Sequence, residues 1–359
     1  MLRRIRRGIG WLFVLVVLLA IGLAIPVVYI ESRCQDLPRE NSYEPLLTEA
    51  QWQRDKSETF LDYPRNHVAY AQADLAKVLE TGDEHEFDFT NSIVGYWTSF
   101  CEVNRLASQH GATELDDRIP LHVVGAGFTL DMVLKAAYEE TLGRLLISNR
   151  GEDKTPQDLQ AARVAEDQAR FVRDAPWHAY DFDAAVDALW AEPLVQSMRG
   201  WERRLALGGE WATKSAVAGI VAGRTDDAAN RPEPLHSVVT GLQSGQLSTL
   251  PDVTIAENHQ HYAIIRTLDS RHFTGTLQAI ADAGGRVLEI AGNDEIMVSL
   301  ISPEPVPMAT IAPHRVIAVL DRDGFDDKRV LVVVTIPELA AFMVKLNDSV
   351  VNMERVYAY

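Results

Sequence analysis

Residues 262 to 291 read YAIIRTLDSRHFTGTLQAIADAGGRVLEIA, and this stretch decides the fold of the C-terminal third. Apolar runs at 262–267 and 286–291 predict two strands, and the amphipathic run 270–283 between them predicts a helix. Ser270 is the expected N-cap, and a pair of glycines ends the helix. The stretch therefore predicts one β-α-β unit.

The last residues of the chain repeat this pattern. A helix that opens at Pro337 lies between two apolar runs and gives a second β-α-β unit over 330–357. Two further apolar runs, 296–301 and 315–320, separate the units. Two interleaved units with both helices on one face of an antiparallel sheet form the ferredoxin-like architecture. We therefore predict a ferredoxin-like domain over 259–359, with the hairpin-like stretch from Arg315 as an extra edge strand.

Residues 61–224 show a different periodicity, with apolar side chains at helical spacing and little strand alternation. The clearest apolar stripe runs through 128–147, and Thr155 and Pro156 are a typical N-cap and first helical residue. The residue pattern predicts an all-α domain over 61–224. With the C-terminal domain, this gives the α+β fold class.

Two connecting segments complete the predicted organisation. Residues 31–60 are polar and contain one expected short helix, from Thr48 to about Phe60. The sequence DDAANRPEP at 226–234 combines charge with two prolines, which is typical of a loop. We predict a juxtamembrane segment at 31–60 and a linker at 225–258.

The N-terminus carries the strongest topological signal. Residues 8 to 30, from Gly8 to Ile30, contain no charged side chain and are long enough to cross a hydrocarbon core of about 30 Å as a helix. Arginines 3, 4, 6 and 7 precede this run, which favours a cytoplasmic N-terminus. We expect a single-pass inner-membrane anchor over 1–30 with the remaining chain exported. A cleaved signal peptide, with Gly22-Leu23-Ala24 near its cleavage site, is the alternative.

Composition narrows the partners and the source of stability. The formal net charge is −17, and the four N-terminal arginines leave −21 for residues 31–359. Such an acidic body is repelled by phosphate backbones, so nucleic acid is excluded as an expected partner. Only Cys34 and Cys101 are cysteines, so there is no disulfide framework. Cys101 is either a small buried hydrophobe or the partner of Cys34 in an oxidising compartment.

Three stretches of the chain carry a family resemblance. They are YPRNHVAYAQADLA (63–76), YWTSFCEVNRLASQHG (96–111) and AAYEETLGRL (136–145). In these stretches the helical part resembles an uncharacterised family of single-pass, N-terminally anchored bacterial membrane proteins. The resemblance covers about a third of the chain and implies membrane attachment, but it implies no activity.

His67 is the strongest single catalytic candidate. It precedes Tyr70 and Asp74 on a predicted helix, and a His–Asp pair supports general base chemistry where the two side chains meet in a cleft. Seven residues of separation are too many for a direct bond, so a third group is required. A capping or packing role is the alternative. A cleft that gathered His67 with Glu139, Glu140 and His178 would favour an enzyme.

Metal and cofactor signals are weak, and we expect neither. His259 and His261 would share one side of a strand, but they lie in a polar run. The acidic turn with Asp321, Asp323, Asp326 and Asp327 does not have EF-hand spacing. The sequence Gly125-Ala126-Gly127 before a helix lacks the third glycine of a dinucleotide loop, and a glycine-relieved helix contact is the alternative.

The stretch 190–224 differs from the acidic body. It is locally basic, with Arg203 and Arg204 among its cations, and Trp190, Trp201 and Trp211 are interleaved. Tryptophan beside arginine is typical of a membrane interface. We consider two interpretations, a surface that lies against the membrane or a partner's transmembrane helix, and a buried helical pair with arginine stems along the core.

Two function classes follow. The first is a membrane-tethered, non-catalytic module that binds another envelope component or a small ligand. The second is an exported hydrolase that uses His67 and acidic residues of the helical domain. The scattered polar residues favour the first class.

Overall fold

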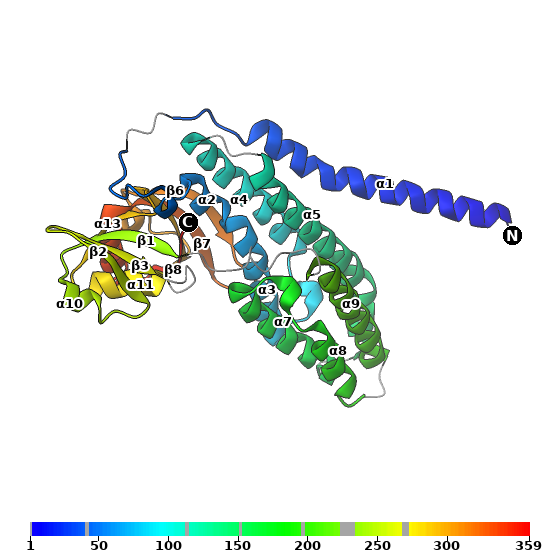
Figure 1. Cartoon of the computed structure of the whole chain (residues 1–359). Coiled ribbons are helices and arrows are strands. Elements are labelled where there is room, and N and C mark those ends of the chain that lie inside the picture. Colours follow the sequence, from blue (N-terminus) through cyan, green and yellow to red (C-terminus); the bar gives the residue numbers. More distant parts are fainter. Residues whose placement is uncertain are drawn as a thin grey trace.

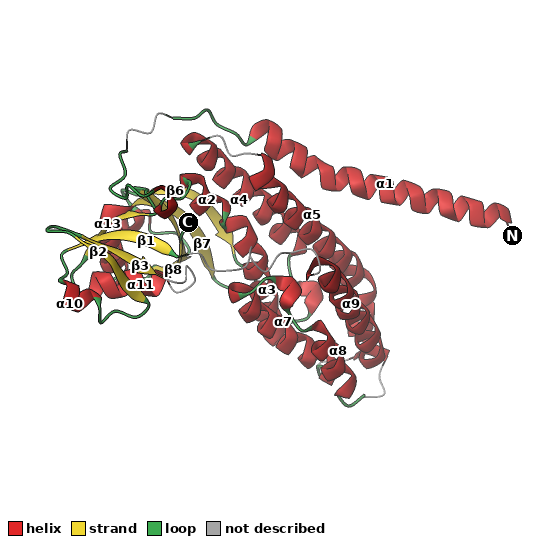
Figure 2. Cartoon of the chain, viewed as in Figure 1, coloured by secondary structure: helices red, strands yellow, loops and turns green. Residues whose placement is uncertain are grey.

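The computed structural model describes residues 2–39, 43–111, 115–150, 153–194, 198–222, 234–267 and 273–359. It contains a helical part and a part with two four-stranded antiparallel sheets, so the α+β class is confirmed (Figures 1 and 2). The predicted N-cap Ser270 lies outside the described residues, and so does most of the predicted loop at 226–234.

The N-terminal helix α1 spans Leu2–Arg33 and projects away from the body (Figure 1). Its C-terminal end is held to the helical part. Glu31 accepts two hydrogen bonds from Arg118, at 3.0 and 2.9 Å, and also contacts His122 Nε2 at 2.7 Å. A disulfide joins Cys34 to Cys101. The open question about these cysteines is thereby answered, and the end of α1 is joined covalently to α4.

The helical part is built from long helices with short connections. Its elements are η1 (Ala50–Trp52), α2 (Lys56–Leu61), α3 (Tyr63–Thr81), η2 (Glu84–Glu86), α4 (Phe89–His110), α5 (Leu115–Tyr138), the π-helical turn η3 (Glu139–Gly143), α6 (Arg144–Arg150), α7 (Pro156–Asp174), η4 (Trp177–Ala179), α8 (Phe182–Ala191) and α9 (Met198–Ala222).

Local chemistry explains where these helices begin. Thr155 caps α7 with a capping box, in which its side chain accepts from Asp158 N–H and the Asp158 carboxylate accepts from Thr155 N–H. Pro156 follows at the first helical position, as predicted. The single helix predicted over 48–60 is wrong, because the chain is extended between η1 and α2, where the Asp55 side chain caps α2.

The sheet part contains two successive β-α-β-β-α-β units. The first consists of β1 (Leu235–Thr240), α10 (Ser244–Leu247), β2 (Val253–Asn258), β3 (Ala263–Thr267), α11 (Phe273–Asp282) and β4 (Arg286–Ile290). The second consists of β5 (Glu295–Pro303), α12 (Met308–Ile311), β6 (Arg315–Asp321), β7 (Asp327–Thr335), α13 (Ile336–Asn347) and β8 (Asn352–Tyr357). The strand orders are β2-β3-β1-β4 and β6-β7-β5-β8, so the two units have the same topology.

This arrangement corrects two predictions. The two predicted β-α-β units do not interleave in one sheet, because each forms the second half of its own sheet. Residues 235–258 are not a linker, because they form β1, α10 and β2. Strand β2 lies at a sheet edge and is mostly exposed. Because it buries few side chains, its sequence lacks the alternation of apolar and polar residues that predicts a strand.

The core is layered. Side chains from both sheets pack with α11 and α13 in one cluster, which includes Phe273, Leu277, Phe342 and Met343. The second sheet also packs against the helical part, where Leu331 and other strand residues share a cluster with α3 and α4. The helical part and the second sheet therefore share one hydrophobic core.

The chain segment before α2 ties the first sheet to the rest. The carboxylate of Glu289 on β4 is fully buried and accepts from Leu47 N–H at 2.9 Å and from Leu46 N–H at 2.5 Å. Tyr43 Oη donates to the same carboxylate at 2.5 Å. The segment predicted to be juxtamembrane thus covers a sheet.

Among the described residues, one continuous helical run, Leu115–Ser148, is long and apolar enough to span a membrane. It comprises α5, η3 and most of α6. Length and composition alone support this, and core helices of soluble proteins pass the same test.

Candidate binding site

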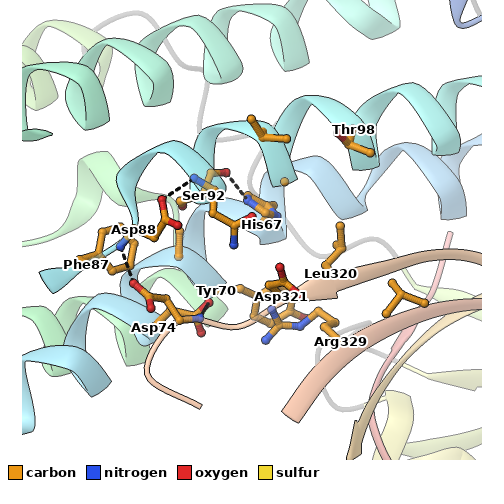
Figure 3. Close-up of a pocket in the computed structure, with 16 residues that line it drawn as sticks. His67, Tyr70, Asp74, Phe87, Asp88, Ser92, Thr98, Leu320, Asp321 and Arg329 are labelled. Atoms are coloured by element: carbon orange, nitrogen blue, oxygen red, sulfur yellow. Dashed lines mark hydrogen bonds between the residues drawn. The ribbon is translucent and has the colours of Figure 1, made fainter. Parts of the chain in front are cut away.

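A cavity of about 150 Å³ lies where the helical part meets the second sheet (Figure 3). Helices α3 and α4 form one side, and the end of β6, its turn and the start of β7 form the other. His67, Asp74 and Arg329 line it, from elements more than 240 residues apart in the chain. The predicted pair His67 and Asp74 therefore shares one cavity.

His67 lies on α3 and is 8% exposed. Its Nε2 is 3.0 Å from the backbone carbonyl oxygen of Ser92, which can only accept, so Nε2 carries the proton and donates. Burial lowers the pKa of His67 to about 4. The ring is neutral at pH 7, and its Nδ1 is a buried lone pair with no hydrogen-bond partner among the described residues.

Asp74 lies two turns further along α3 and is 7% exposed. Its Oδ2 accepts from Asp323 N–H at 3.3 Å, while Oδ1 has no hydrogen-bond partner among the described residues. Burial raises the pKa of Asp74 to about 7, against the opposing effects of Arg329 and Arg322. The surroundings of Asp74 therefore stabilise its ionised carboxylate less than water does; we call such a carboxylate under-compensated.

Hydrogen bonds fix the turn between β6 and β7 over the cavity. Asp323 Oδ2 accepts from Asp88 N–H at 2.6 Å, and the Asp88 side chain accepts from Asn91 N–H to cap α4. The Asp323 backbone in turn binds Asp74. These bonds join α3, the turn and the start of α4, so the cavity wall is preorganised.

Arg329 is the cation that lines the cavity, and its charge is already balanced. It donates two hydrogen bonds to Glu354, at 2.7 and 2.9 Å, and its guanidinium lies 3.7 Å from the ring centroid of Tyr70. Four aspartates line the same space: Asp74, Asp88, Asp321 and Asp323. The cavity is consequently acidic, and two of its lining residues each carry a buried acceptor with no hydrogen bond among the described residues, Asp74 Oδ1 and His67 Nδ1.

This chemistry suits a small cation that donates N–H bonds. An ammonium group can donate to a carboxylate and to a neutral imidazole at once. The walls also include Phe87, Val94 and Leu320, which suit the carbon atoms of an organic amine. Among the described residues, no nucleophilic side chain is hydrogen-bonded to His67, which leaves the predicted hydrolase without a partner for its base.

Metal candidates lie elsewhere. Within the described ranges, one group of three side chains has metal-like spacing, Asp83, His85 and Glu86 at η2. None of these three residues lines the cavity, although Phe87 and Asp88, which do, follow them directly in the chain. The sequence analysis did not predict a metal site at these residues. His259 contacts Glu257 at 2.9 Å and stacks on Tyr262, while His261 is exposed.

The remaining predicted residues do not join His67. Glu139 is buried in an ion pair with Arg203, and Glu140 is exposed in a pair with Arg144. His178 lies in η4 and stacks edge-on against Trp177. The cleft that would have favoured an enzyme is therefore not formed by these four residues. In the acidic turn, Asp321 binds Lys328 and Asp327 binds Arg322, which matches a solvated hairpin turn.

Gly125 and Gly127 lie inside α5 and not in a loop, so a dinucleotide loop is absent at these positions. A Cβ on Gly125 would lie 2.4 Å from the Tyr96 ring and 2.9 Å from Trp97. The glycine is needed for close contact between α5 and α4, which is the alternative we considered.

The basic stretch is buried in part. Arg203 and Arg204 are 1% and 8% exposed, and Trp211 is 4% exposed, while Trp190 and Trp201 are about half exposed. Arg203 pairs with Glu84 at 2.8 Å, and Arg204 lies 5.2 Å from the Trp190 ring centroid. The charges of Arg203 and Arg204 are therefore engaged within the helical part.

No protein-family model, curated protein or solved structure matches the chain. The resemblance of the helical part to a family of single-pass membrane proteins therefore stays a prediction.

Proposed function

We propose that the protein is a membrane-tethered, non-catalytic binding module of the cell envelope, and that its ligand is a small organic cation held in the cavity between the helical part and the second sheet. The observation that carries the proposal is a pair of buried acceptors with no hydrogen bond among the described residues, Asp74 Oδ1 and His67 Nδ1, on two residues that line one acidic cavity. Arg322 Nε lies 4.0 Å from the Asp74 oxygen, beyond hydrogen-bond distance. A ligand at this place would contact both parts of the body.

The tether is the apolar run Gly8–Ile30 of α1, with the N-terminus in the cytoplasm and the bulk of the body on the far side of the inner membrane. The disulfide between Cys34 and Cys101 supports this orientation, because disulfides persist in oxidising compartments. We also propose that the two sheets are tandem ferredoxin-like modules, since both have the strand order of that architecture.

An organic amine is favoured over a metal ion. A metal requires several oxygen or nitrogen atoms gathered at bonding distance. The carboxylates around the cavity are instead engaged by backbone N–H groups and by Lys328, and the group with metal-like spacing among the described residues lies outside the cavity.

Thermal unfolding of the full-length protein in detergent tests the proposal, with ethanolammonium and putrescine as probes. At pH 8, where Asp74 is ionised, either amine should raise the melting temperature, because a ligand that binds only the folded state stabilises it. Tetramethylammonium has the charge but no N–H donor, and it should have a weaker effect.

Matched variants place the effect at the cavity. Asp74→Asn should abolish the amine-dependent shift, and Asp326→Asn should retain it, because Asp326 lies on the same turn but does not line the cavity. A shift produced by Mg²⁺ or Ca²⁺ and not by amines, or an amine effect that survives Asp74→Asn, would contradict the proposal.

A further inference from the structure

Helix α9 has an inverted distribution of polarity. Over the whole of this helix, the well-exposed residues are uncharged, and the charged side chains are buried or only partly exposed. The large ones are Met198, Trp201, Leu205, Val217 and Ile220, with exposures from 43 to 74%. A surface helix of a soluble protein places its charged side chains on this face.

The charged residues of α9 point into the protein instead. Arg199 and Arg203 are the largest fully buried side chains among the described residues. Glu210 and Lys214 bind each other at 2.7 Å and reach Lys135 and Asp131 of α5, at 3.2 and 3.3 Å. Where ionisable residues occur in membrane-embedded helices, they face the interior of the bundle and pair with one another in this way.

Helix α5 lies beside α9, as these bonds and Figure 1 show, and it has the same inversion. Between 118 and 139, the exposed residues are uncharged, and they include Ile119, Val123 and Leu134. Exposed charges appear before this stretch at Asp116 and after it at Glu140. Twenty-two helical residues span about 33 Å, close to the thickness of a hydrocarbon core.

Helix α7 of the same bundle is ordinary by comparison. Its exposed residues include Arg163, Glu166, Asp167 and Arg170, and its exposed apolar residue is Leu159. The inversion therefore belongs to one side of the helical part, formed by α5 and α9, which we name the α5–α9 face.

We infer that the α5–α9 face contacts the acyl chains of the membrane in which α1 is anchored. This inference rests on the proposed tether. The disulfide and the Glu31–Arg118 pair hold the end of the apolar run of α1 against α4 and the start of α5. The uncharged face thus begins where the anchor ends, and its uncharged length matches a bilayer core.

Lipid suits this face better than a protein partner. The face is uncharged along two adjacent helices and includes Gly209, Ala212 and Ala216 between its larger residues. Its partly exposed charges, Asp131 and Glu210, are already paired with Lys214, and the half-exposed Trp201 of α9 is a residue that favours the membrane interface.

Photolabelling tests the inference on the full-length protein in phosphatidylcholine nanodiscs that contain a lipid with a diazirine on its acyl chain. After irradiation and digestion, peptides of α5 and α9 should carry about tenfold more label than peptides of α7, because the carbene forms inside the hydrocarbon core. Labelling of α1 in the same sample tests the tether separately.

Two variants serve as a matched pair. Leu205→Glu should reduce the labelling of α9 several-fold, and Leu159→Glu should leave the labelling of α5 and α9 unchanged, with the melting temperature of each variant as the folding control. Label in α1 without label in α5 and α9 would overturn this inference and leave the tether intact. Crosslinks between the α9 helices of two copies, with no lipid label on α9, would show that the face binds a second copy of the chain. That result would also overturn the inference. No label in α1 would refute the tether.

Discussion

Arg203 and Asp74 are both buried charged side chains of the helical part, but their surroundings differ. Arg203 donates to Glu84 and Glu139 and lies 3.4 Å from Glu202, so opposite charge surrounds it. Asp74 has one backbone donor at 3.3 Å and a guanidinium no closer than 4.0 Å. A buried charge that is fully paired supports the fold, whereas one that is poorly paired costs stability and is available to a ligand.

Removal of the paired charge should have the largest effect. Arg203→Met leaves Glu84 and Glu139 buried without their common partner, which should lower the free energy of unfolding by about 3–5 kcal/mol. Arg170→Met is the control, because Arg170 is 65% exposed and its ion pairs are at 3.6 and 3.8 Å; the control should change stability by less than about 0.5 kcal/mol. Chemical denaturation measures both. Equal losses of stability in the two variants would show that the buried ion pairs of Arg203 contribute no more than the exposed ion pairs of Arg170.

Removal of the poorly paired charge should act in the opposite direction. At pH 8, Asp74→Asn should stabilise the protein by about 2 kcal/mol, because the ionised carboxylate is disfavoured in its buried site. Denaturation at pH 8 and at pH 4 checks this, since the gain should disappear at pH 4, where the folded state holds Asp74 protonated. A loss of stability at pH 8 would mean that the carboxylate is well compensated.

The combined contribution of Asp74 and His67 to the pH dependence of stability should be the smallest effect, because the two groups oppose each other. The folded-state pKa of Asp74 is about 7 against 3.8, so this group lowers stability as pH rises from about 4 to 7. The folded-state pKa of His67 is about 4 against 6.5, so this group lowers stability as pH falls from 6.5 to 4.

Single variants should separate these two contributions. Asp74→Asn should make stability rise with pH between 4 and 6.5, and His67→Gln should make it fall between 4 and 7. The melting temperature as a function of pH is the measurement. Parallel curves for the natural protein and both variants would show that neither group titrates abnormally.

Local features of the fold could be predicted from the sequence, and long-range pairings could not. The capping box at Thr155 uses residues three apart, and the strands at 262–267 and 286–291 are apolar runs. Assignment of those strands to two sheets depends on β1, whose buried residues lie in a stretch next to charge and proline. Neighbouring residues do not specify which strands pair.

The candidate site shows the same limit. His67 and Asp74 stood out on one helix, but the turn that binds Asp74 carries Asp323, 249 residues away along the chain. That turn stood out only as an acidic cluster, and Arg329 did not stand out at all. It directly follows Lys328 at the start of an apolar run, so the sequence does not distinguish it from the charged turn.

The central claim is that Asp74 is an under-compensated carboxylate in a cavity that accepts an amine. Its most direct test is the pKa of the Asp74 carboxyl in the full-length protein, measured by carbon NMR with and without ethanolammonium. The account predicts a pKa of about 7 in the free protein and a clear decrease when the amine is bound. A pKa near 4 in the free protein, or no change on saturation with the amine, would contradict it.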